Sequence, residues 1–452
     1  MLIYVYMGGV RKFLAQAELC ACVVAIVTMT GITCRGDDTN DVREQLRVLQ
    51  QQNQQLQEQL NRQQQMIDSL SRKVSEVDTA SQARASELQS ELATPPAVAT
   101  PAAKPFSFGK IVLSGEGGLA FFESGSQGQF PNAEFRIDEA RLFLDAQVWD
   151  DTYFFTELDL ATRENPGVNV SVEELYVDFE NVSRLWNQDR MLNIRVGRFN
   201  IPFGEEYQTR YAIDNPLIAH SLSDIWGVDQ GLEVYGCLGK FDYVLAVQNG
   251  GVNVDDFNAD KSIAGRLGYS PTHWLRLSAS AMRTGNINVQ QDGIAALWFG
   301  NAYLSSIGSP STTLFHSELA EGDVQLRLGR GQIKAAGGYL HYGDNDTAAN
   351  NNRDVYYYFV EGQYDVTKKL FAAARFSQIM ANDGFLLIGD GSFQNYGSAL
   401  SKNLWRLTLG TGYRFSPNLV LKADYSLERG EQSNGETRDH EDLFDIELAY
   451  RF

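Results

Sequence analysis

The chain has 452 residues, more than one ordinary globular domain needs, although only 43% of them are apolar and the mean hydropathy is −0.28. Its 57 acidic and 38 basic residues give a formal net charge of −19, which excludes the chain-wide basic surface that nucleic-acid binding requires. Aromatic residues make up 11%, and there are 40 glycines but only 11 prolines, so the composition favours many tyrosine-rich strands over helices. The apolar content is too high for a wholly disordered chain.

Residues 1–34 have the pattern of an export signal. Two basic residues precede an apolar run, 13–33, that holds a single charge. The run is just long enough to be a transmembrane anchor instead, and Cys22 or Cys34 could carry a lipid. Cleavage near Cys34 would leave at most two of the four cysteines, so no disulfide framework is expected.

Residues 37–92 are rich in Gln, Glu and Arg, with apolar side chains at alternating spacings of three and four. This heptad pattern predicts a coiled coil and therefore self-association, although a Gln-rich disordered tether would have a similar composition. Residues 93–105 carry four prolines among alanines, which end the helix and form a semi-rigid linker. The best heptad positions are Leu46, Leu49, Asn53, Leu56, Leu60, Gln63, Ile67, Leu70, Val74 and Val77.

From residue 106 to residue 452 the hydrophobic period changes to two. In residues 141–148, Leu142 and Leu144 alternate with Arg141 and Phe143. About sixteen such blocks occur, and bacterial barrels have an even number of strands. We therefore predict an all-β transmembrane barrel of about sixteen antiparallel strands, in which the mixed face of each strand lines the lumen.

The connections between these blocks alternate between short and long, as expected when one end of a barrel carries tight turns. A soluble sandwich or propeller, the alternative, has no reason to segregate connection lengths in this way. The expected turns are 150–151, 182–190, 239–240, 270–272, 329–331, 367–369 and 416–418. The expected long loops are 124–132, 162–168, 198–229, 250–261, 284–313, 343–353, 382–402 and 430–441.

The last block places five apolar side chains on one face and ends on an aromatic residue, as is usual for the closing strand of outer-membrane barrels. These residues are Phe444, Ile446, Leu448, Tyr450 and Phe452. Aromatic residues near other strand ends suit the girdles at the membrane interfaces. We assign Trp149, Tyr153, Trp274, Tyr413 and Tyr450 to these girdles.

The stretch 195–204, Arg-Val-Gly-Arg-Phe-Asn-Ile-Pro-Phe-Gly, resembles the strand-end motif of the phosphate-selective porin O/P family, Gly-x-Phe-Lys-x-Pro-Phe. Asn200 stands where that family commonly has lysine. The resemblance implies a homotrimeric porin in the outer membrane of a Gram-negative-type bacterium, in contact with its lipid. It also implies a coiled coil that lies in the periplasm, and in the alternative of an envelope-tethering barrel this coiled coil would reach toward the cell wall.

The alternation assigns inward charges to two opposite walls of the lumen, which would set up a transverse field across the channel. These residues could equally be solvated side chains paired with neighbours across strands. The acidic wall consists of Asp145, Glu157, Asp159, Glu174 and Asp178, relieved by Arg141. The basic wall consists of Arg266, Arg276, Arg327, Lys334, Arg375, Arg406, Arg414 and Lys422, with Asp424 as the exception.

The loop 198–229 is long and aromatic, which fits a loop that folds into the lumen and narrows it; packing on the rim or on a trimer axis is the alternative. The candidate constriction residues are Arg198, Phe203, Glu205, Glu206, Tyr207, Arg210, Tyr211 and Asp214.

Enzyme motifs are absent from the sequence, and the five histidines are scattered. We therefore expect a non-enzymatic channel without a cofactor, although an outer-membrane lipase remains conceivable. Paired acids at 255–256 and in 344–346 lack the spacing of a regular Ca²⁺ loop, so no metal is expected. The expected function is passive diffusion of small hydrophilic or charged solutes. The alternatives are an anion or phosphate channel and a plugged barrel that tethers the envelope.

Overall fold

The computed structural model describes residues 106–108, 110–163, 170–250, 259–288, 312–346, 348–349, 351–387 and 400–452. The chain divides into two units, Met1–Val98 and Ala99–Phe452. The expected signal 1–34, coiled coil 37–92 and linker 93–105 all lie outside the described residues. Within the part of the chain that the structure describes, no helix is long and apolar enough to cross a membrane.

The described residues form one sheet of nineteen strands, of which β1, β11 and β18 have only two or three residues. The sixteen long strands are β2 (Ile111–Ser124), β3 (Glu134–Trp149), β4 (Thr152–Thr162), β5 (Ser171–Phe179), β6 (Asn193–Asn200), β7 (Val228–Leu238), β8 (Phe241–Gln248), β9 (Ser262–Thr272), β10 (Leu275–Arg283), β12 (Leu314–Leu328), β13 (Gly331–Asp344), β14 (Arg353–Asp365), β15 (Leu370–Phe385), β16 (Ser401–Ser416), β17 (Leu419–Gln432) and β19 (Leu443–Arg451). The short elements are β1 (Phe106–Phe108), β11 (Ile287–Asn288), β18 (Thr437–Arg438) and the 3₁₀ helices η1 (Val182–Trp186) and η2 (Glu206–Thr209).

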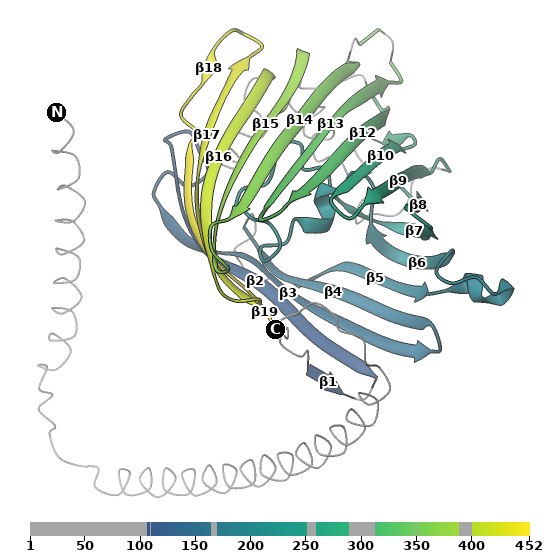
Figure 1. The fold of residues 1–452 in the computed structure, drawn as a ribbon. Coiled ribbons are helices and arrows are strands. Elements are labelled where there is room, and N and C mark those ends of the chain that lie inside the picture. Colours follow the sequence, from purple (N-terminus) through teal and green to yellow (C-terminus); the bar gives the residue numbers. More distant parts are fainter. Residues whose placement is uncertain are drawn as a thin grey trace, which may run out of the picture. The chain divides into compact units, whose positions relative to one another are not determined.

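Each long strand pairs antiparallel with the next along the chain, and the last strand closes the ring on the first (Figure 1). Strand β19 pairs with β2 from Leu443 opposite Ser124 to Arg451 opposite Glu116. Phe452 and Gly115 exchange two further backbone hydrogen bonds of 2.8 and 3.2 Å. A closed ring leaves no unpaired sheet edge. The predicted antiparallel barrel of sixteen strands is therefore confirmed.

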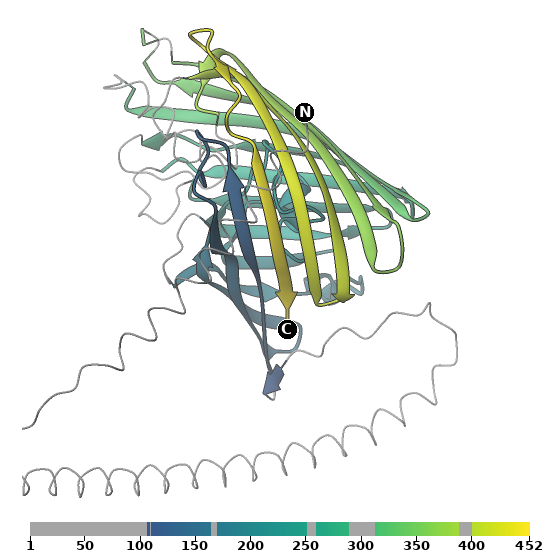
Figure 2. The same ribbon diagram turned by 90° about the vertical axis from the view of Figure 1, so that its left-hand side faces the viewer.

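The strands tilt together across the barrel (Figure 2), and β3, β15 and β16 are the longest of them, with 16 residues each. Connections at one end are tight, as in Gly239–Lys240, whereas those at the other end are long; we call these the turn end and the loop end. One expected turn is wrong: residues 270–272 belong to β9, where Thr272 pairs with Leu275. The chain reverses at His273–Trp274 instead.

The two faces of the barrel differ in the way a membrane barrel requires. Outward-facing side chains are apolar and exposed all round the ring, as shown by Leu119, Leu267, Val360 and Leu409, which are 48–55% exposed. The inward positions between them hold buried charges and small residues. Among the expected girdle residues, Trp149, Trp274 and Tyr413 are exposed, but Tyr153 is not a girdle residue. It shares the inward register of Glu157 on β4 and lines an interior cavity.

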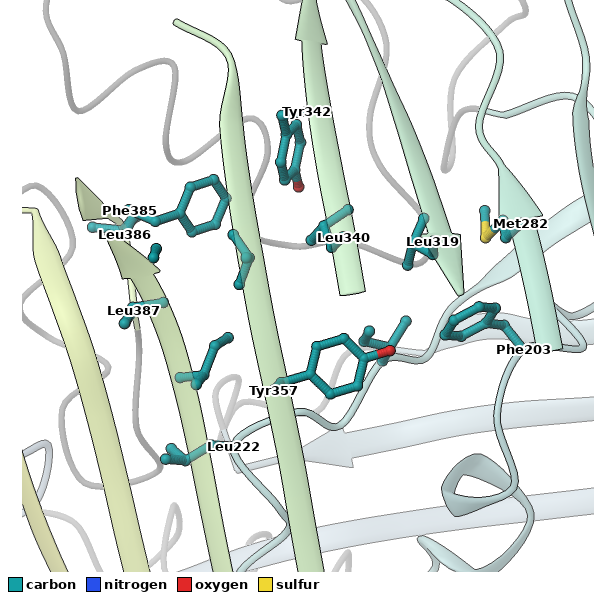
Figure 3. Close-up of a cluster of buried hydrophobic side chains, with 14 of the residues drawn as sticks. Phe203, Leu222, Met282, Leu319, Leu340, Tyr342, Tyr357, Phe385, Leu386 and Leu387 are labelled. Carbon is teal, nitrogen blue, oxygen red and sulfur yellow. The ribbon is translucent and has the colours of Figure 1, made fainter. Parts of the chain in front are cut away.

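A cluster of buried apolar side chains lies inside the ring, toward the loop end of β9 to β16 (Figure 3). Inward residues of the wall, such as Leu340 and Tyr357, meet Phe203 and Leu222 from the connection between β6 and β7. Their burial, at 4% exposure or less, removes apolar surface from water inside the barrel. The barrel interior is therefore partly filled by its own chain.

Candidate functional site

The connection 201–227 between β6 and β7, which we call the inner loop, lies inside the ring of strands, where Figure 1 shows it in teal. The loop turns inward at Gly204, which has a φ of +72°, a conformation that favours glycine. A Cβ at this position would also lie 2.4 Å from Oε1 of Glu321. Gly204 N–H donates to Ser280 Oγ on β10 at 3.0 Å, so the chain turns inward directly from the barrel wall.

The inner loop crosses the lumen, because its residues bond to strands on opposite sides of the ring. Thr209 Oγ1 accepts from Lys334 Nζ on β13 at 3.1 Å. Two residues later, Tyr211 donates to Glu157 on β4 at 3.1 Å, and its ring lies under the guanidinium of Arg141 on β3 at 4.6 Å. Thus a segment of three residues spans from the basic wall to the acidic wall.

Strand β17 holds the far part of the inner loop through one cation and one anion. Lys422 Nζ, on a side chain only 2% exposed, donates to the carbonyls of Ala212 at 2.7 Å and Leu217 at 3.2 Å. The same ammonium pairs with Glu447 on β19 at 2.6 Å. Asp424 Oδ2 accepts from the N–H of Ile218 at 2.6 Å. The carbonyl and the N–H of the peptide between Leu217 and Ile218 are therefore bound by a cation and an anion of the same strand.

Two buried arginines of the barrel wall also bind the inner loop. Arg375 on β15 donates to the carbonyl of Ala219 at 2.5 Å and pairs with Glu361 on β14. Arg406 on β16 donates to the carbonyl of His220 at 2.9 Å and pairs with Glu428 at 2.5 Å. These guanidinium groups therefore serve the inner loop as well as their carboxylate partners.

Ion pairs within the inner loop stabilise its own fold. Arg210 pairs with Asp224 at 3.0 Å, and His220 Nδ1 lies 3.1 Å from the same carboxylate. Burial opposes the charge on Asp224, but Arg210 and His220 outweigh it and hold the pKa of Asp224 below its ordinary value. Ser221 donates from Oγ and from its N–H to Glu206, at 2.5 and 3.1 Å. Burial, reinforced by Asp224, raises the pKa of Glu206.

The candidate constriction residues Glu205, Tyr207 and Asp214 also bind the barrel wall, whereas Arg198 is itself a residue of the wall. Glu205 pairs with Arg276 at 2.7 Å, Tyr207 accepts from Arg266 at 3.1 Å, and Asp214 pairs with Arg451 at 2.6 Å. Arg198 is the exception, because it belongs to β6 and donates to the carbonyl of Glu173 at 2.9 Å. Its register partner, Leu175, is exposed on the outer face, so Arg198 is on the outer side of the wall and is not a constriction residue.

Most residues of the predicted acidic wall are engaged with the chain's own cations and N–H groups. Arg141 lies 3.1 Å from Glu157 and 3.3 Å from Asp159, Glu174 accepts from the N–H of Asn200 at 2.8 Å, and Asp178 pairs with Arg195 at 3.0 Å. Asp145 is exposed on the inner face of β3, and it has no ion-pair partner among the described residues.

Most bases of the predicted basic wall are paired with carboxylates, which the sequence interpretation missed. Besides the pairs of Arg375, Arg406 and Lys422, Lys334 lies 3.7 Å from Glu361 and Arg414 lies 2.8 Å from Asp365. Arg266 lies 3.4 Å from Glu205, and Arg276 lies 2.6 Å from Asp242. Arg327 is exposed at the turn end of β12. The alternation rule places Glu361, Glu428 and Glu447 on inward positions, so it could have identified them.

The inner loop does not fill the part of the lumen beside β4 to β9. A cavity of about 980 Å³ is bounded by β4 to β9 and by Tyr207 of the inner loop, and it extends to the turn end at Asp151 and Asn181. Six acids and four arginines line it: Asp151, Glu174, Glu180, Asp189, Glu233, Asp242, Arg184, Arg190, Arg195 and Arg266. Among the described residues, no three His, Cys, Asp or Glu side chains are grouped to hold a metal ion. The acid pair at 255–256 lies outside the described residues.

No family model and no curated protein sequence matches this chain. Solved structures with a similar fold include OmpT, an outer membrane protein of Vibrio cholerae folded in vitro. That likeness has a TM-score of 0.52 at 13% identity and covers 77% of this chain and 100% of that chain. The outer membrane channel DcaP of Acinetobacter baumannii gives a TM-score of 0.52 at 11% identity, with 76% and 97% covered. The described part of the chain therefore has the sixteen-stranded fold of outer-membrane porins.

Proposed function

We propose that this protein is an outer-membrane porin, a non-enzymatic channel for the passive diffusion of small hydrophilic or charged solutes. The observation that carries the proposal is the inversion of polarity across the wall. Exposed apolar side chains cover the outside, and buried or cavity-lining charges cover the inside. Such a surface is costly in water and stable in lipid, and the polar interior is then the only aqueous route through it.

Conductance of the full chain in planar bilayers tests this proposal. A steady ohmic current in KCl is the expected result, because the cavity on the β4–β9 side is not filled by the inner loop and is lined by charged groups. Absence of any steady current from correctly inserted protein would contradict it. That result would favour the plugged barrel that tethers the envelope, whose support is the part of the interior filled by the inner loop and the apolar cluster.

An anion or phosphate channel is the second candidate within the porin class. Its support is the motif at 195–204, which in this chain carries Phe199 into a fully buried position before the chain enters the inner loop. Against it stands the pairing of the basic residues with carboxylates on neighbouring strands. Reversal potential in a salt gradient distinguishes an anion channel from a cation channel.

The remaining parts of the proposal rest on sequence patterns. An export signal would deliver the chain to the bacterial outer membrane. Heptads in 37–92 would assemble a homotrimer, with the coiled coil in the periplasm near the cell wall. Mass measurement in detergent, with and without residues 37–92, tests the oligomer: loss of the trimer on deletion is expected, and an unchanged mass would assign assembly to the barrels alone.

A further inference from the structure

A row of aromatic rings follows the inner face of β3, β4 and β5 and continues into the inner loop. We call it the aromatic track, and its members are Tyr153, Phe155, Phe143, Tyr176 and Tyr211. Phe155 stacks on Tyr176 with ring centroids 5.1 Å apart and lies 6.2 Å from Phe143, which in turn lies 6.1 Å from Tyr211. Tyr176, Phe155, Phe143 and Tyr211 therefore form one connected surface that reaches the inner loop.

The rings of the aromatic track are only partly buried, unlike those of the apolar cluster. Tyr342, Tyr357 and Phe385 are 3% exposed or less, because they pack against the inner loop and one another. Phe143 and Phe155 face the interior with part of their surface accessible. Phenylalanine on the polar face of a barrel leaves apolar area in water without adding to membrane burial. Packing of the barrel therefore does not explain these two rings.

Two arginines of the protein already lie over neighbouring rings of the aromatic track. The guanidinium of Arg195 lies 4.2 Å above the ring of Tyr176, and that of Arg141 lies 4.6 Å from the ring centre of Tyr211. Among the described residues, no arginine or lysine lies over Phe143 or Phe155. A planar cation placed there would gain the same quadrupole attraction.

The arginines near these two rings are paired with carboxylates, and the unpaired charge beside the rings is negative. Asp145 is directly opposite Phe155 in the β3–β4 register, and its exposed carboxylate has no ion-pair partner among the described residues. Glu157, which lies opposite Phe143, shares Arg141 with Asp159 and Glu139. The available counter-charge for a bound solute is therefore negative.

We infer that the aromatic track binds organic cations with a planar apolar body during their passage through the channel, with Phe143 and Phe155 holding the ring and Asp145 the charge. The inference rests on the proposed channel function and names its preferred solute class. Partly exposed rings supply apolar and cation–π attraction, and the unpaired carboxylate selects cations over anions of the same shape.

Block of single-channel current by three probes tests the inference on the full chain. Benzyltrimethylammonium carries a ring and a cation, tetramethylammonium carries the cation alone, and benzoate carries the ring with the opposite charge. Benzyltrimethylammonium is expected to block at the lowest concentration. Equal block by benzoate, or equal block by tetramethylammonium, would overturn the inference.

Variants locate the binding to the aromatic track. Phe155→Leu should raise the apparent dissociation constant of benzyltrimethylammonium by about tenfold, and Phe143→Leu and Asp145→Asn should act in the same direction. The matched control is Phe241→Leu, which removes a ring stacked at 4.6 Å on Tyr269 at a position 45% exposed on the outer face, and block should not change. The wild-type current in KCl alone tests the channel itself, and the current of each variant in KCl shows whether that variant folds and conducts. An unchanged dissociation constant in conducting Phe143→Leu and Phe155→Leu variants refutes only the inferred site.

Discussion

The buried charged side chains inside this barrel mainly hold the inner loop in place. Lys422 is the clearest case. Its ammonium is buried away from water, pairs with Glu447 and also donates to two carbonyls of the inner loop. A buried pair of this kind contributes little net free energy of folding when intact, but loss of one partner leaves an uncompensated charge. Pairs at the turn end, such as Arg414 with Asp365, are partly exposed and therefore screened.

We predict that Lys422→Met lowers the free energy of unfolding by about 3–5 kcal/mol, because Glu447 remains buried without its counter-ion. Arg414→Met is the matched control and should cost about 0–1 kcal/mol. Urea unfolding of the purified protein in lipid, followed by tryptophan fluorescence, measures both variants. Similar losses for the two variants would show that Lys422 does not hold the loop.

At the scale of elements, the inner loop is held by both polar and apolar contacts. The polar contacts come from strands all round the ring, including β4, β10, β13, β17 and β19, whereas Phe203 and Leu222 pack into the cluster drawn in Figure 3. Removing a single contact therefore leaves the loop fixed by the others. Removing the loop itself opens the cross-section that it occupies.

Deletion of residues 205–224 should raise the single-channel conductance, because this segment bridges opposite walls of the lumen. Recording the wild type and the deletion variant in the same KCl solution checks the expectation. The deletion also unpairs Arg266 and Lys422 from the loop, so the comparison should be repeated at high salt, where their charges are screened. Unchanged conductance in both solutions would place the inner loop outside the ion path.

The inner loop should stay in place under mild acid. Asp224 has a lowered pKa, so its ion pairs contribute stability that is fully present above its ordinary pKa and is lost only as the pH falls through the lower, folded value. Glu206 has a raised pKa, so its protonation on acidification relieves a buried charge rather than adding one. We expect no step increase in wild-type conductance between about pH 7 and about pH 4. Such a step, absent from the 205–224 deletion variant, would contradict this balance.

At the scale of the whole molecule, the barrel was predictable because period-two alternation and alternating connection lengths repeat in every hairpin. The interaction partners of individual residues were harder to predict from the sequence. Glu361 and Glu428 lie on inward positions beside Arg375 and Arg406, yet a rule that sorts strands by their dominant charge overlooks them. The path of the inner loop was not deducible, because Thr209 and Tyr211 meet strands more than fifty positions away in the chain. Tyr153 was misassigned because only its position near a strand end was considered, although its alternation with Glu157 on β4 places it on the inner face.

We expect the cavity beside β4 to β9 to determine the sign of selectivity, and its lining contains six acids against four arginines. We therefore expect the reversal potential in a KCl gradient to show a preference for cations, since the basic residues on the opposite wall are paired and partly covered by the inner loop. Asn200→Lys should shift the potential toward anions, because Asn200 lines this cavity beside Glu174. Asn434→Lys adds the same charge at an exposed position of a loop-end connection and should shift it less. A wild-type preference for anions, or equal shifts in the two variants, would mean that ions pass along a different wall.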